Sequence, residues 1–313
     1  MKKSIVFMGT PDFAVPVLEA LIDHQYKIDL VVTQPDRPKG RKKQLTPPPV
    51  KVAAEKHGIP VFQPEKIKND WGAIQQVKPD LIITAAFGQI LPKELLDFPQ
   101  DGCINVHASL LPKLRGGAPI HYSILQGHPE TGISIMYMTE KLDAGAIISQ
   151  QAIPIEESDN VGTLHDKLSQ VGADLLMETL PDFLAGNIDA REQEETEVTY
   201  APNIKREDEK IDWGREQTDI FNQVRGLCPW PVAFTTWDTK TVKVWQAEKS
   251  DQISDKEPGT IHDIKTDGIL VVTGDHKTIK ITELQPAGKK RMPVEDFLRG
   301  AGNTLTVGAK FGE

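Results

Sequence analysis

The stretch GCINVHASLLPKLRGGAP, residues 102–119, joins an apolar run to a loop rich in leucine, glycine and proline. Its first six residues predict a β-strand in which Asn105 and His107 project from the same side, because side chains alternate along a strand. A buried polar side chain without a partner costs on the order of 1–3 kcal/mol. Ligands of open α/β sheets bind at the carboxyl ends of strands, so Asn105 and His107 are candidate functional residues.

The rest of the N-terminal half alternates similar apolar runs with helical patterns. Further strands are predicted at residues 4–8, 28–33 and 80–85, with helical spacing of apolar residues after the first of them. The runs are nearly continuous in valine, isoleucine and leucine, as in a sheet covered on both faces. Strands that alternate with helices predict a mainly parallel α/β sheet.

The pattern changes in the middle of the chain. Residues 133–153 contain two strand-like runs around Leu142-Asp143-Ala144-Gly145, and residues 161–184 predict one long helix whose end Pro181 distorts or interrupts. Residues 187–197 are acidic and poor in core-forming side chains, so they predict the start of a solvated linker.

Beyond residue 207 the sequence is typical of β-structure. Asp267-Gly268 separates the runs 260–264 and 269–273, which is a hairpin signal. Several short strands with turn signals predict a small barrel or sandwich. A length of 313 residues also favours about two domains.

The charge of the chain limits its partners. With 36 Lys and Arg against 45 Asp and Glu, the net charge is −9, which excludes a protein that coats nucleic acid nonspecifically. Residues 1–204 carry −8 of this and residues 205–313 only −1. A local basic patch is still possible, for example at Lys289-Lys290-Arg291.

The sequence favours a cytoplasmic protein. No stretch of 18 residues lacks a charge, so no transmembrane helix is expected. The apolar part of the N-terminus is too short for a signal peptide. Cys103 and Cys228 lie 125 positions apart and fit a reducing compartment better than a disulfide scaffold.

Several common chemistries leave no motif in this sequence. There is no G-x-G-x-x-G or G-x-x-x-x-G-K-[ST] phosphate loop, no C-x-x-C, no H-E-x-x-H and no G-x-S-x-G. A nicotinamide dehydrogenase, a P-loop ATPase, a zinc site and a serine hydrolase are therefore disfavoured, and no metal is expected.

Three elements could form a site. Asn105 can donate a hydrogen bond to a developing oxyanion, and His107 can move protons near neutral pH. Asp143 lies 36 residues after His107 and could orient its ring. The alternatives are that Asn105 and His107 only cap the strand, and that Asp143 is a turn aspartate before Gly145.

The third element is a basic segment in a loop rich in proline and glycine, which consists of Arg37, Lys39, Arg41, Lys42 and Lys43. A mobile basic loop in an acidic protein is a natural phosphate contact. The alternative is a solvated run of charges.

Taken together, these residues resemble the signature of the folate-dependent formyltransferases. The resemblance covers nearly the whole chain. It rests on NVHASLLP at 105–112, RGGAPI at 115–120, FMGTPDF at 7–13, TQPDRP at 33–38, AAFGQILP at 85–92, ETGISIM at 130–136, LDAG at 142–145, PWP at 229–231 and QPAGK at 285–289. The GTPDF opening at 9–13 and the presence of the C-terminal domain favour the branch of the family that acts on a charged initiator tRNA.

The resemblance implies a fold, a reaction and partners. It implies a Rossmann-like formyltransferase domain at 1–189, a linker at 190–206 and an OB-like β-barrel domain that binds tRNA at 207–313. It implies transfer of a formyl group from 10-formyltetrahydrofolate to the amino group of methionine on initiator tRNA. Nothing in it demands a membrane or more than a monomer.

The resemblance also implies roles for single residues. The catalytic positions of the family match Asn105, His107 and Asp143. The folate-binding positions match Ser109, Leu110, Leu111 and Pro112, with Phe87 and Gly88 in the apolar wall for the pterin ring. The tRNA-binding loop matches Arg37, Lys39, Arg41, Lys42 and Lys43. Leu114 stands where an aromatic residue is common, and Phe87 where tyrosine is common.

Two other functions stay open at this point. A formyltransferase acting on a small amine, such as glycinamide ribonucleotide or an amino sugar, would need neither the basic loop nor the second domain. A non-catalytic nucleic-acid-binding protein would leave Asn105, His107 and Asp143 unexplained, and would be expected to have a basic barrel.

Overall fold

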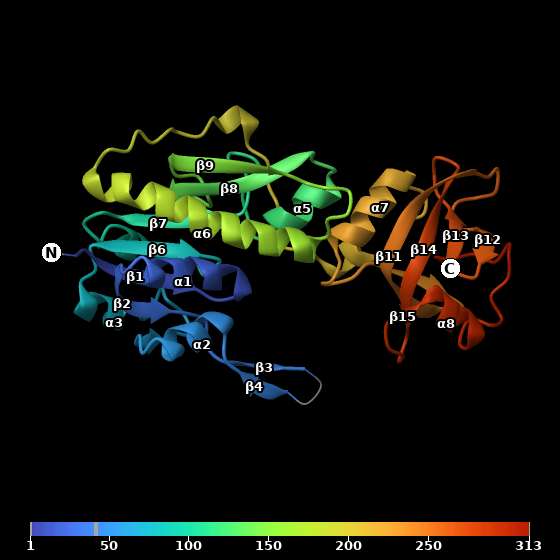
Figure 1. Ribbon diagram of the computed structural model, residues 1–313, viewed down its shortest axis with the longest axis horizontal. Helices are drawn as coiled ribbons and strands as arrows, with labels where there is room; N and C mark the ends of the chain where they lie inside the picture. The colour runs from blue at the N-terminus through green and yellow to red at the C-terminus, as the bar shows by residue number, and fades with distance from the viewer. Residues whose placement is uncertain (1, 41–42, 313) are drawn as a thin grey trace. The chain divides into compact units, whose positions relative to one another are not determined.

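The computed structural model describes residues 2–40 and 43–312, which form two compact units. The first unit contains Met1–Pro119, Glu130–Pro154 and His165–Ala201, and the second contains Ile120–Pro129, Ile155–Leu164 and Pro202–Glu313. Each unit has its own sheet (Figure 1). The domain limits at residues 189 and 207 stay a prediction.

The first unit is built on a seven-stranded sheet of order β5-β2-β1-β6-β7-β8-β9. The strands from β5 to β7 are parallel, whereas β8 and β9 are antiparallel to their neighbours. The bounds are β1 Ser4–Gly9, β2 Lys27–Val32, β5 Val61–Phe62, β6 Leu81–Ala85, β7 Cys103–His107, β8 Glu130–Tyr137 and β9 Ile147–Pro154. The predicted α/β sheet is therefore confirmed, with an antiparallel edge of two strands.

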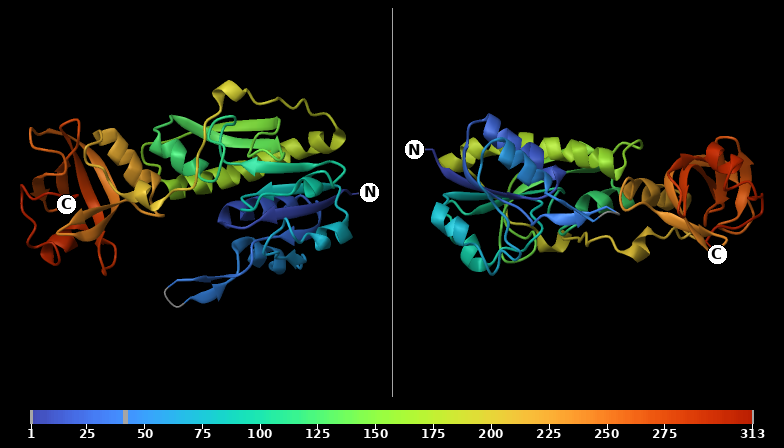
Figure 2. Two further views of the ribbon diagram at one scale, coloured as in Figure 1. Left: turned by 180° about the vertical axis from the view of Figure 1, so that it is seen from behind. Right: turned by 90° about the horizontal axis from the view of Figure 1, so that it is seen from below.

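Helices cover both faces of this sheet (Figure 2). One apolar cluster joins residues of β1, β2 and β6 to α3 and α4. On the other face α6 packs so closely that a Cβ atom on Gly172 would lie 2.9 Å from Val106 of β7. The helices of this unit are α1 Val15–Asp23, α2 Pro49–Lys56, α3 Gly72–Val77, α4 Lys93–Leu96 and most of α6 Val161–Ala185, with a short 3-10 turn at Asp12–Ala14, whereas α5 Pro119–Leu125 belongs almost entirely to the second unit.

Two sequence predictions need correction in this unit. Pro181 lies inside α6, which continues to Ala185, so the expected interruption at Pro181 is wrong. The basic segment was expected to be a loop, but β3 Arg37–Lys39 and β4 Gln44–Thr46 pair as a short antiparallel hairpin. The hairpin stands out from the body of the first unit (Figure 1).

The second unit is an antiparallel β-domain, as predicted. Its strands follow the order β10-β11-β14-β13-β12, and β15 also pairs with β14. The predicted hairpin at Asp267-Gly268 is confirmed by the pairing of Lys265 with Gly268. The bounds are β10 Phe234–Trp237, β11 Lys240–Ile253, β12 Ile261–Lys265, β13 Gly268–Val272, β14 Lys277–Pro286, β15 Met292–Pro293, α7 Gln217–Gly226 and α8 Val294–Arg299, with 3-10 turns at Glu195–Glu197 in the first unit and Arg206–Glu209 in the second.

The two edge strands of the second sheet are partly paired by neighbouring segments. The N–H of Gly312 donates to the carbonyl of Thr236 in β10, at 2.9 Å. The N–H of Ile261 in β12 donates to Ala309, at 2.8 Å. Phe311 in the same segment is buried and stacks on Trp213. Residues 308–312 therefore connect both edges and complete the core of this unit.

Candidate active site

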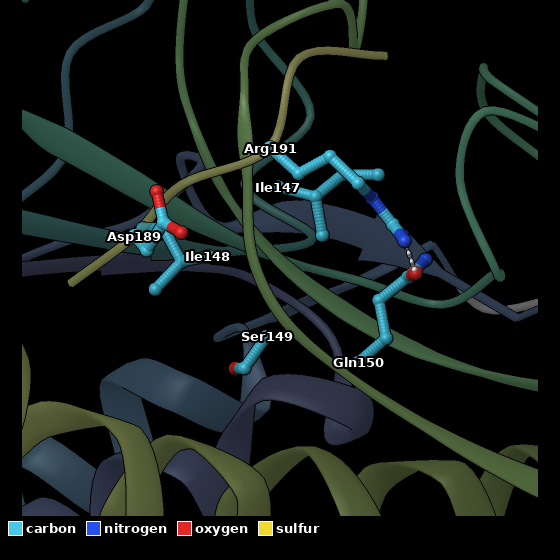
Figure 3. Close-up of a pocket in the computed structure, with 6 residues that line it drawn as sticks. All are labelled: Ile147, Ile148, Ser149, Gln150, Asp189 and Arg191. Carbon is cyan, nitrogen blue, oxygen red and sulfur yellow. Dashed lines mark hydrogen bonds between the residues drawn. The ribbon is translucent and has the colours of Figure 1, made fainter. Parts of the chain in front are cut away.

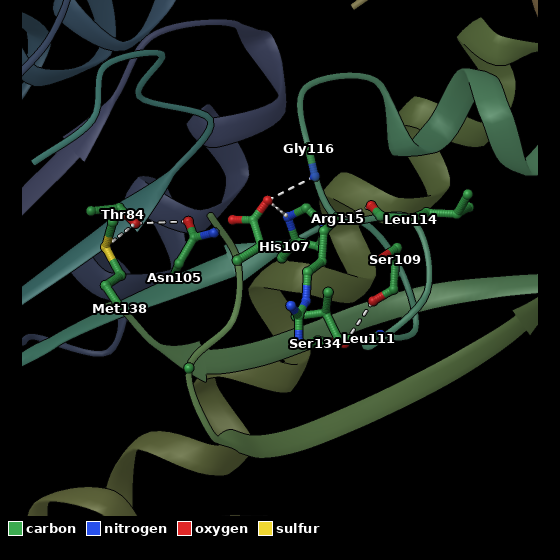
Figure 4. A network of polar contacts seen from close by, with 12 residues as sticks. Thr84, Asn105, His107, Ser109, Leu111, Leu114, Arg115, Gly116, Ser134 and Met138 are labelled. Atoms are coloured by element: carbon green, nitrogen blue, oxygen red, sulfur yellow. Dashed lines mark hydrogen bonds and ion pairs between the residues drawn. The ribbon is translucent and has the colours of Figure 1, made fainter. Parts of the chain in front are cut away.

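Asn105 lies on β7 and is held by the neighbouring strand. The hydroxyl of Thr84 on β6 donates a hydrogen bond to Oδ1 of Asn105, at 2.7 Å. Val106 packs toward α6, so Asn105 and His107 point to the opposite face of the sheet. Among the described residues, none accepts a hydrogen bond from Nδ2 of Asn105. The two N–H donors of the amide therefore lie on the side away from Thr84 (Figure 4).

His107 is buried at the end of β7, and its ring has two defined neighbours. Nε2 lies 3.2 Å from the backbone carbonyl of Leu114. A carbonyl oxygen can only accept, so Nε2 carries the proton of this hydrogen bond. Nδ1 faces the carboxylate of Asp143, with 3.8 Å between Nδ1 and Oδ2. The nitrogen available for proton transfer is therefore Nδ1.

Asp143 reaches His107 through a turn that folds back over the sheet. Tyr137 pairs with Ile104, so the chain leaves β8 beside the start of β7, about 10 Å from His107 at the usual rise per residue. Asp143 has a positive φ of 47°. Its Oδ2 accepts a hydrogen bond of 2.9 Å from the N–H of Gly116. The turn therefore places the carboxylate between the Gly116 amide and the ring of His107.

A glycine is required in this turn. A Cβ atom on Gly145 would lie 1.9 Å from the carbonyl oxygen of Tyr137. No other residue type fits at this distance, because a Cβ would overlap the oxygen. The sequence Asp143-Ala144-Gly145 is thus what allows the turn to close against β8.

The segment Ser109–Pro112 is anchored by polar side chains of β8 and β9. Ser134 donates to the carbonyl of Ser109 at 2.6 Å and accepts from the N–H of Leu111 at 3.0 Å. Gln150 donates to the carbonyl of Leu111 at 2.9 Å and to Ser134 at 2.8 Å. The loop conformation is therefore fixed by two residues, Ser134 and Gln150, that the sequence analysis did not single out.

The side chains of this segment differ in burial. The hydroxyl of Ser109 donates to the carbonyl of Lys113 at 2.7 Å. Leu111 packs in a small core with Met136 and Ile147. Leu110 is half-buried. Leu110 is thus better placed than Leu111 to contact a bound ring.

Phe87 and Gly88 follow β6. Phe87 is buried in the apolar cluster that contains Leu91 and Leu95. Its carbonyl accepts hydrogen bonds from Thr10 at 2.8 Å and from Gln34 at 3.3 Å. Gly88 has a φ of 88°, which favours glycine. The backbone at Phe87 is therefore fixed by hydrogen bonds, and the Phe87 ring packs in the hydrophobic core.

The basic residues lie on the β3–β4 hairpin. Arg37, Lys39 and Lys43 are exposed, and Arg37 forms an ion pair of 2.7 Å with Glu65. Arg41 and Lys42 lie outside the described residues. The described part of this segment therefore offers a small cationic surface at the end of a hairpin.

An open hollow of about 590 Å³ lies beside the edge strand β9 (Figure 3). Arg191 donates to Oε1 of Gln150 across it, at 2.8 Å. It is lined by Ile147, Ile148, Ser149, Gln150, Asp189 and Arg191, so it contains none of the predicted site residues. Two of its lining residues contact the predicted site: Gln150 through its hydrogen bond to Leu111, and Ile147 by packing against Leu111.

The described residues contain no group of three or more His, Cys, Asp and Glu side chains that could hold a metal ion. In the same part of the chain, no helix has both the length and the apolar character that a membrane crossing needs. Cys103 and Cys228 are both buried, and burial raises the pKa of the Cys103 thiol to about 12.

Comparisons with known families agree with the resemblance. Residues 2–180 match the family described as formyl transferase, and residues 203–302 match the formyl transferase C-terminal domain. A methionyl-tRNA formyltransferase of Geobacillus sp. (strain WCH70) is 63% identical over 311 residues, covering 99% of this chain and 98% of that protein. The protein of the same name from Bacillus subtilis (strain 168) is 62% identical over 299 residues, covering 95% and 94%.

Solved structures show the same fold at low identity. HypX from Aquifex aeolicus in complex with tetrahydrofolic acid has a TM-score of 0.67 at 16% identity, covering 96% of this chain and 48% of that chain. This chain thus spans about half the length of HypX. The sugar 3N-formyl transferase WlaRD has a TM-score of 0.67 at 18% identity, covering 93% of this chain and 100% of that chain. With two family models across its length and relatives above 60% identity, the chain belongs to the formyl transferase family, in its methionyl-tRNA formyltransferase group.

Proposed function

We propose that Asn105, His107 and Asp143 carry out the reaction of this enzyme. That reaction moves the formyl group of 10-formyltetrahydrofolate to the amino group of methionine on initiator methionyl-tRNA. The observation that supports the assignment is their arrangement. Asn105 and His107 point to the same face from alternate positions of β7, and Nδ1 of His107 lies 3.8 Å from Oδ2 of Asp143.

The chemistry assigns each group a task. The amine must be neutral to attack, because a protonated amine has no lone pair. As its nitrogen bonds to the formyl carbon, the carbonyl electrons move to oxygen, and the N–H donors of Asn105 stabilise that oxyanion. The amine proton passes to Nδ1 of His107 and then to the folate nitrogen as its bond to carbon breaks.

Asp143 has a different task from the one expected of an orienting carboxylate. The distance of 3.8 Å to Nδ1 exceeds that of a hydrogen bond, while the carbonyl of Leu114 already fixes the ring at 3.2 Å. Asp143 therefore stabilises the imidazolium that forms when His107 takes the proton. Its own position depends on the amide of Gly116.

The segments Ser109–Pro112 and Phe87–Gly88 bind the formyl donor in this proposal. The donor set fits that group, because a flat apolar ring needs walls and the transferred carbonyl needs N–H donors. Leu110 supplies apolar surface and the backbone of Gly88 permits close approach. The bonds from Ser134 and Gln150 hold the loop ready before binding.

The phosphates at the acceptor end of the tRNA are contacted in this proposal by the basic residues Arg37, Lys39, Arg41, Lys42 and Lys43. The distribution of charge supports this role. The chain as a whole is acidic, so a local cationic segment can contact the phosphates of one part of a tRNA without binding nucleic acid in general. Residues 1–189 act as the catalytic domain, 190–206 as the linker, and 207–313 as the second tRNA-binding domain. The chain acts as a monomer in the cytoplasm, without a membrane, and its two buried free thiols fit a reducing compartment.

One assay tests the function. Purified protein is given 10-formyltetrahydrofolate with charged initiator tRNA, free methionine or glycinamide ribonucleotide, and formylated product is measured. We expect product with the charged tRNA only. Formylation of glycinamide ribonucleotide at a comparable rate would favour the small-amine alternative, and no product with any acceptor would exclude catalysis.

A further inference from the structure

The acidic segment after α6 contains one buried polar residue. Gln193 is only 9% exposed, while Glu192 and Glu194 on either side are exposed. The prediction that residues 187–197 are solvated is therefore wrong at this position. Removing a side-chain amide from water requires hydrogen bonds that replace those lost, so the partners of Gln193 indicate its role.

Those partners lie in the turn that carries Asp143. Nε2 of Gln193 donates to the backbone carbonyls of Asp143 and Gly145, both at 2.8 Å. Oε1 accepts from Nε of Arg115, at 3.0 Å. Both N–H donors and the oxygen of the amide are thus used, and two of the three bonds restrain one turn.

Arg115 ties the same amide to the segment opposite the turn. Its side chain is 3% exposed and its guanidinium also pairs with Glu195, at 3.1 Å. The next residue along the chain is Gly116, whose N–H holds the Asp143 carboxylate. Asp143 is therefore restrained from two sides, with its carboxylate bound to Gly116 and its main chain bound to Gln193.

This restraint matters because of the shape of the turn. The turn leaves β8 away from His107 and folds back across the sheet, and Asp143 adopts a positive φ of 47° there. Such a conformation persists only where surrounding contacts hold it. Without the two donors of Gln193, the turn loses its bonds to buried carbonyls, and the 3.8 Å approach of Asp143 to His107 is no longer fixed.

We propose that Gln193 is a positioning residue for Asp143, and that the segment after α6 is thereby part of the catalytic apparatus. Gln193 touches neither substrate and acts through the carboxylate. The inference rests on the proposed role of Asp143 in formyl transfer. It extends the site to a segment that its composition marks only as a linker.

The first test replaces the amide by an apolar side chain of similar length. In Gln193→Met, kcat falls about tenfold, as expected for two lost hydrogen bonds, while KM for the folate and for the charged tRNA stays within about twofold. Glu192→Met is the matched control on the adjacent exposed residue and keeps full activity. Equal kcat values for both variants and the unmodified protein would overturn the proposal.

A second variant covers the case in which Gln193→Met does not fold. Gln193→Glu keeps the length and the acceptor for Arg115, but it has no N–H groups for the two carbonyls. We expect it to fold, by circular dichroism, and to lose kcat as Gln193→Met does. A Gln193→Glu protein with unchanged kcat would show that the donors are not needed, against the proposal.

A double-mutant cycle separates positioning from general stability. Gln193→Glu is combined with Asp143→Ala, and single turnovers are measured with enzyme in excess. If Gln193 acts through Asp143, Gln193→Glu has less than about a twofold effect in the Asp143→Ala background. The same loss in both backgrounds would overturn the proposal. If Asp143→Ala alone kept full activity, the proposed function of Asp143 would fail instead.

Discussion

The hydroxyl group of Thr84 donates a hydrogen bond of 2.7 Å to Oδ1 of Asn105 across the parallel pair β6–β7. Thr84 is 2% exposed, so its hydroxyl is shielded from water. The bond holds the oxygen of the amide against Thr84, so the N–H groups, which we propose as the oxyanion donors, are left for other partners. The orientation of Asn105 thus depends on a neighbour that takes no part in the chemistry.

Thr84→Val removes this donor at nearly constant volume. The amide of Asn105 then loses one orienting bond of about 0.5–1.5 kcal/mol, and kcat should fall about fivefold with KM for both substrates unchanged. Thr84→Ser retains the hydroxyl and should keep most of the activity. The measurement is the steady-state kcat of the two variants. Equal kcat values for Thr84→Val and Thr84→Ser would contradict the orienting role of the hydroxyl.

Asn105→Ala and His107→Ala remove the proposed oxyanion donor and proton carrier. Each should lower kcat by about 10²-fold or more, the usual loss for such groups. Asn187→Ala and His24→Ala are controls of the same residue types at exposed positions. Near-normal turnover in both Asn105→Ala and His107→Ala would show that the catalytic assignment is wrong.

Ser134→Ala removes the hydroxyl that joins Ser109 to Leu111. The proposed folate loop becomes less ordered before binding, so KM for 10-formyltetrahydrofolate should rise about fivefold with a smaller change in kcat. Thr131→Val is the control on the same strand, because the buried Thr131 hydroxyl has no hydrogen-bond partner among the described residues. A Ser134→Ala protein with unchanged KM would count against this loop as the folate site.

Replacing Lys39 and Lys43 together by alanine tests the hairpin. KM for the charged tRNA should rise. The slope of log KM against log salt concentration should become smaller by up to about 0.9 for each phosphate contact that is lost. KM for the folate should not change, and Arg41→Ala carries the same expectation. Lys68→Ala removes an exposed charge elsewhere in the unit as the control. An unchanged salt dependence of KM would show that Lys39 and Lys43 do not contact the tRNA.

The Cys103 thiol should be unreactive in the folded protein. Burial raises its pKa to about 12, and an acid with a raised pKa stays protonated as the pH passes its ordinary value. At pH 8 a maleimide should therefore label neither Cys103 nor the buried Cys228 until denaturant is added. Rapid labelling of the folded protein at pH 8 would contradict the burial of these thiols.

Local patterns in the sequence were enough to predict the sheet and the placement of Asn105 and His107 on one side of a strand. The alternation around Asn105 and His107 follows from strand geometry alone, and the apolar runs predicted the parallel strands. The position of Asp143 could not be derived in this way. Its approach to His107 depends on a turn that folds back over the sheet, so the sequence pattern left a turn aspartate as an alternative, and the family resemblance favoured the catalytic role.

Residues that act through tertiary contacts left no local signal. Gln193 stands in an acidic segment whose composition predicts solvation, yet its partners lie 50 and 48 positions earlier in the chain. Ser134 and Gln150 look like ordinary strand residues, although they fix the loop at Leu111. The paired segments Arg37–Lys39 and Gln44–Thr46 were expected to be part of a loop because proline and glycine disfavour strands.

The paired edges of the second sheet limit how this unit can associate. Unpaired edge strands recruit other chains through their free N–H and C=O groups, in aggregates as well as in strand-by-strand recognition of peptides. Here Ile211 and Gly312 donate to β10, and residues 308–311 lie along β12. A fusion or substitution that detached residues 308–312 would leave the outer edge of β12 unpaired and that of β10 paired only near Phe234, so the protein would precipitate before its reaction slowed.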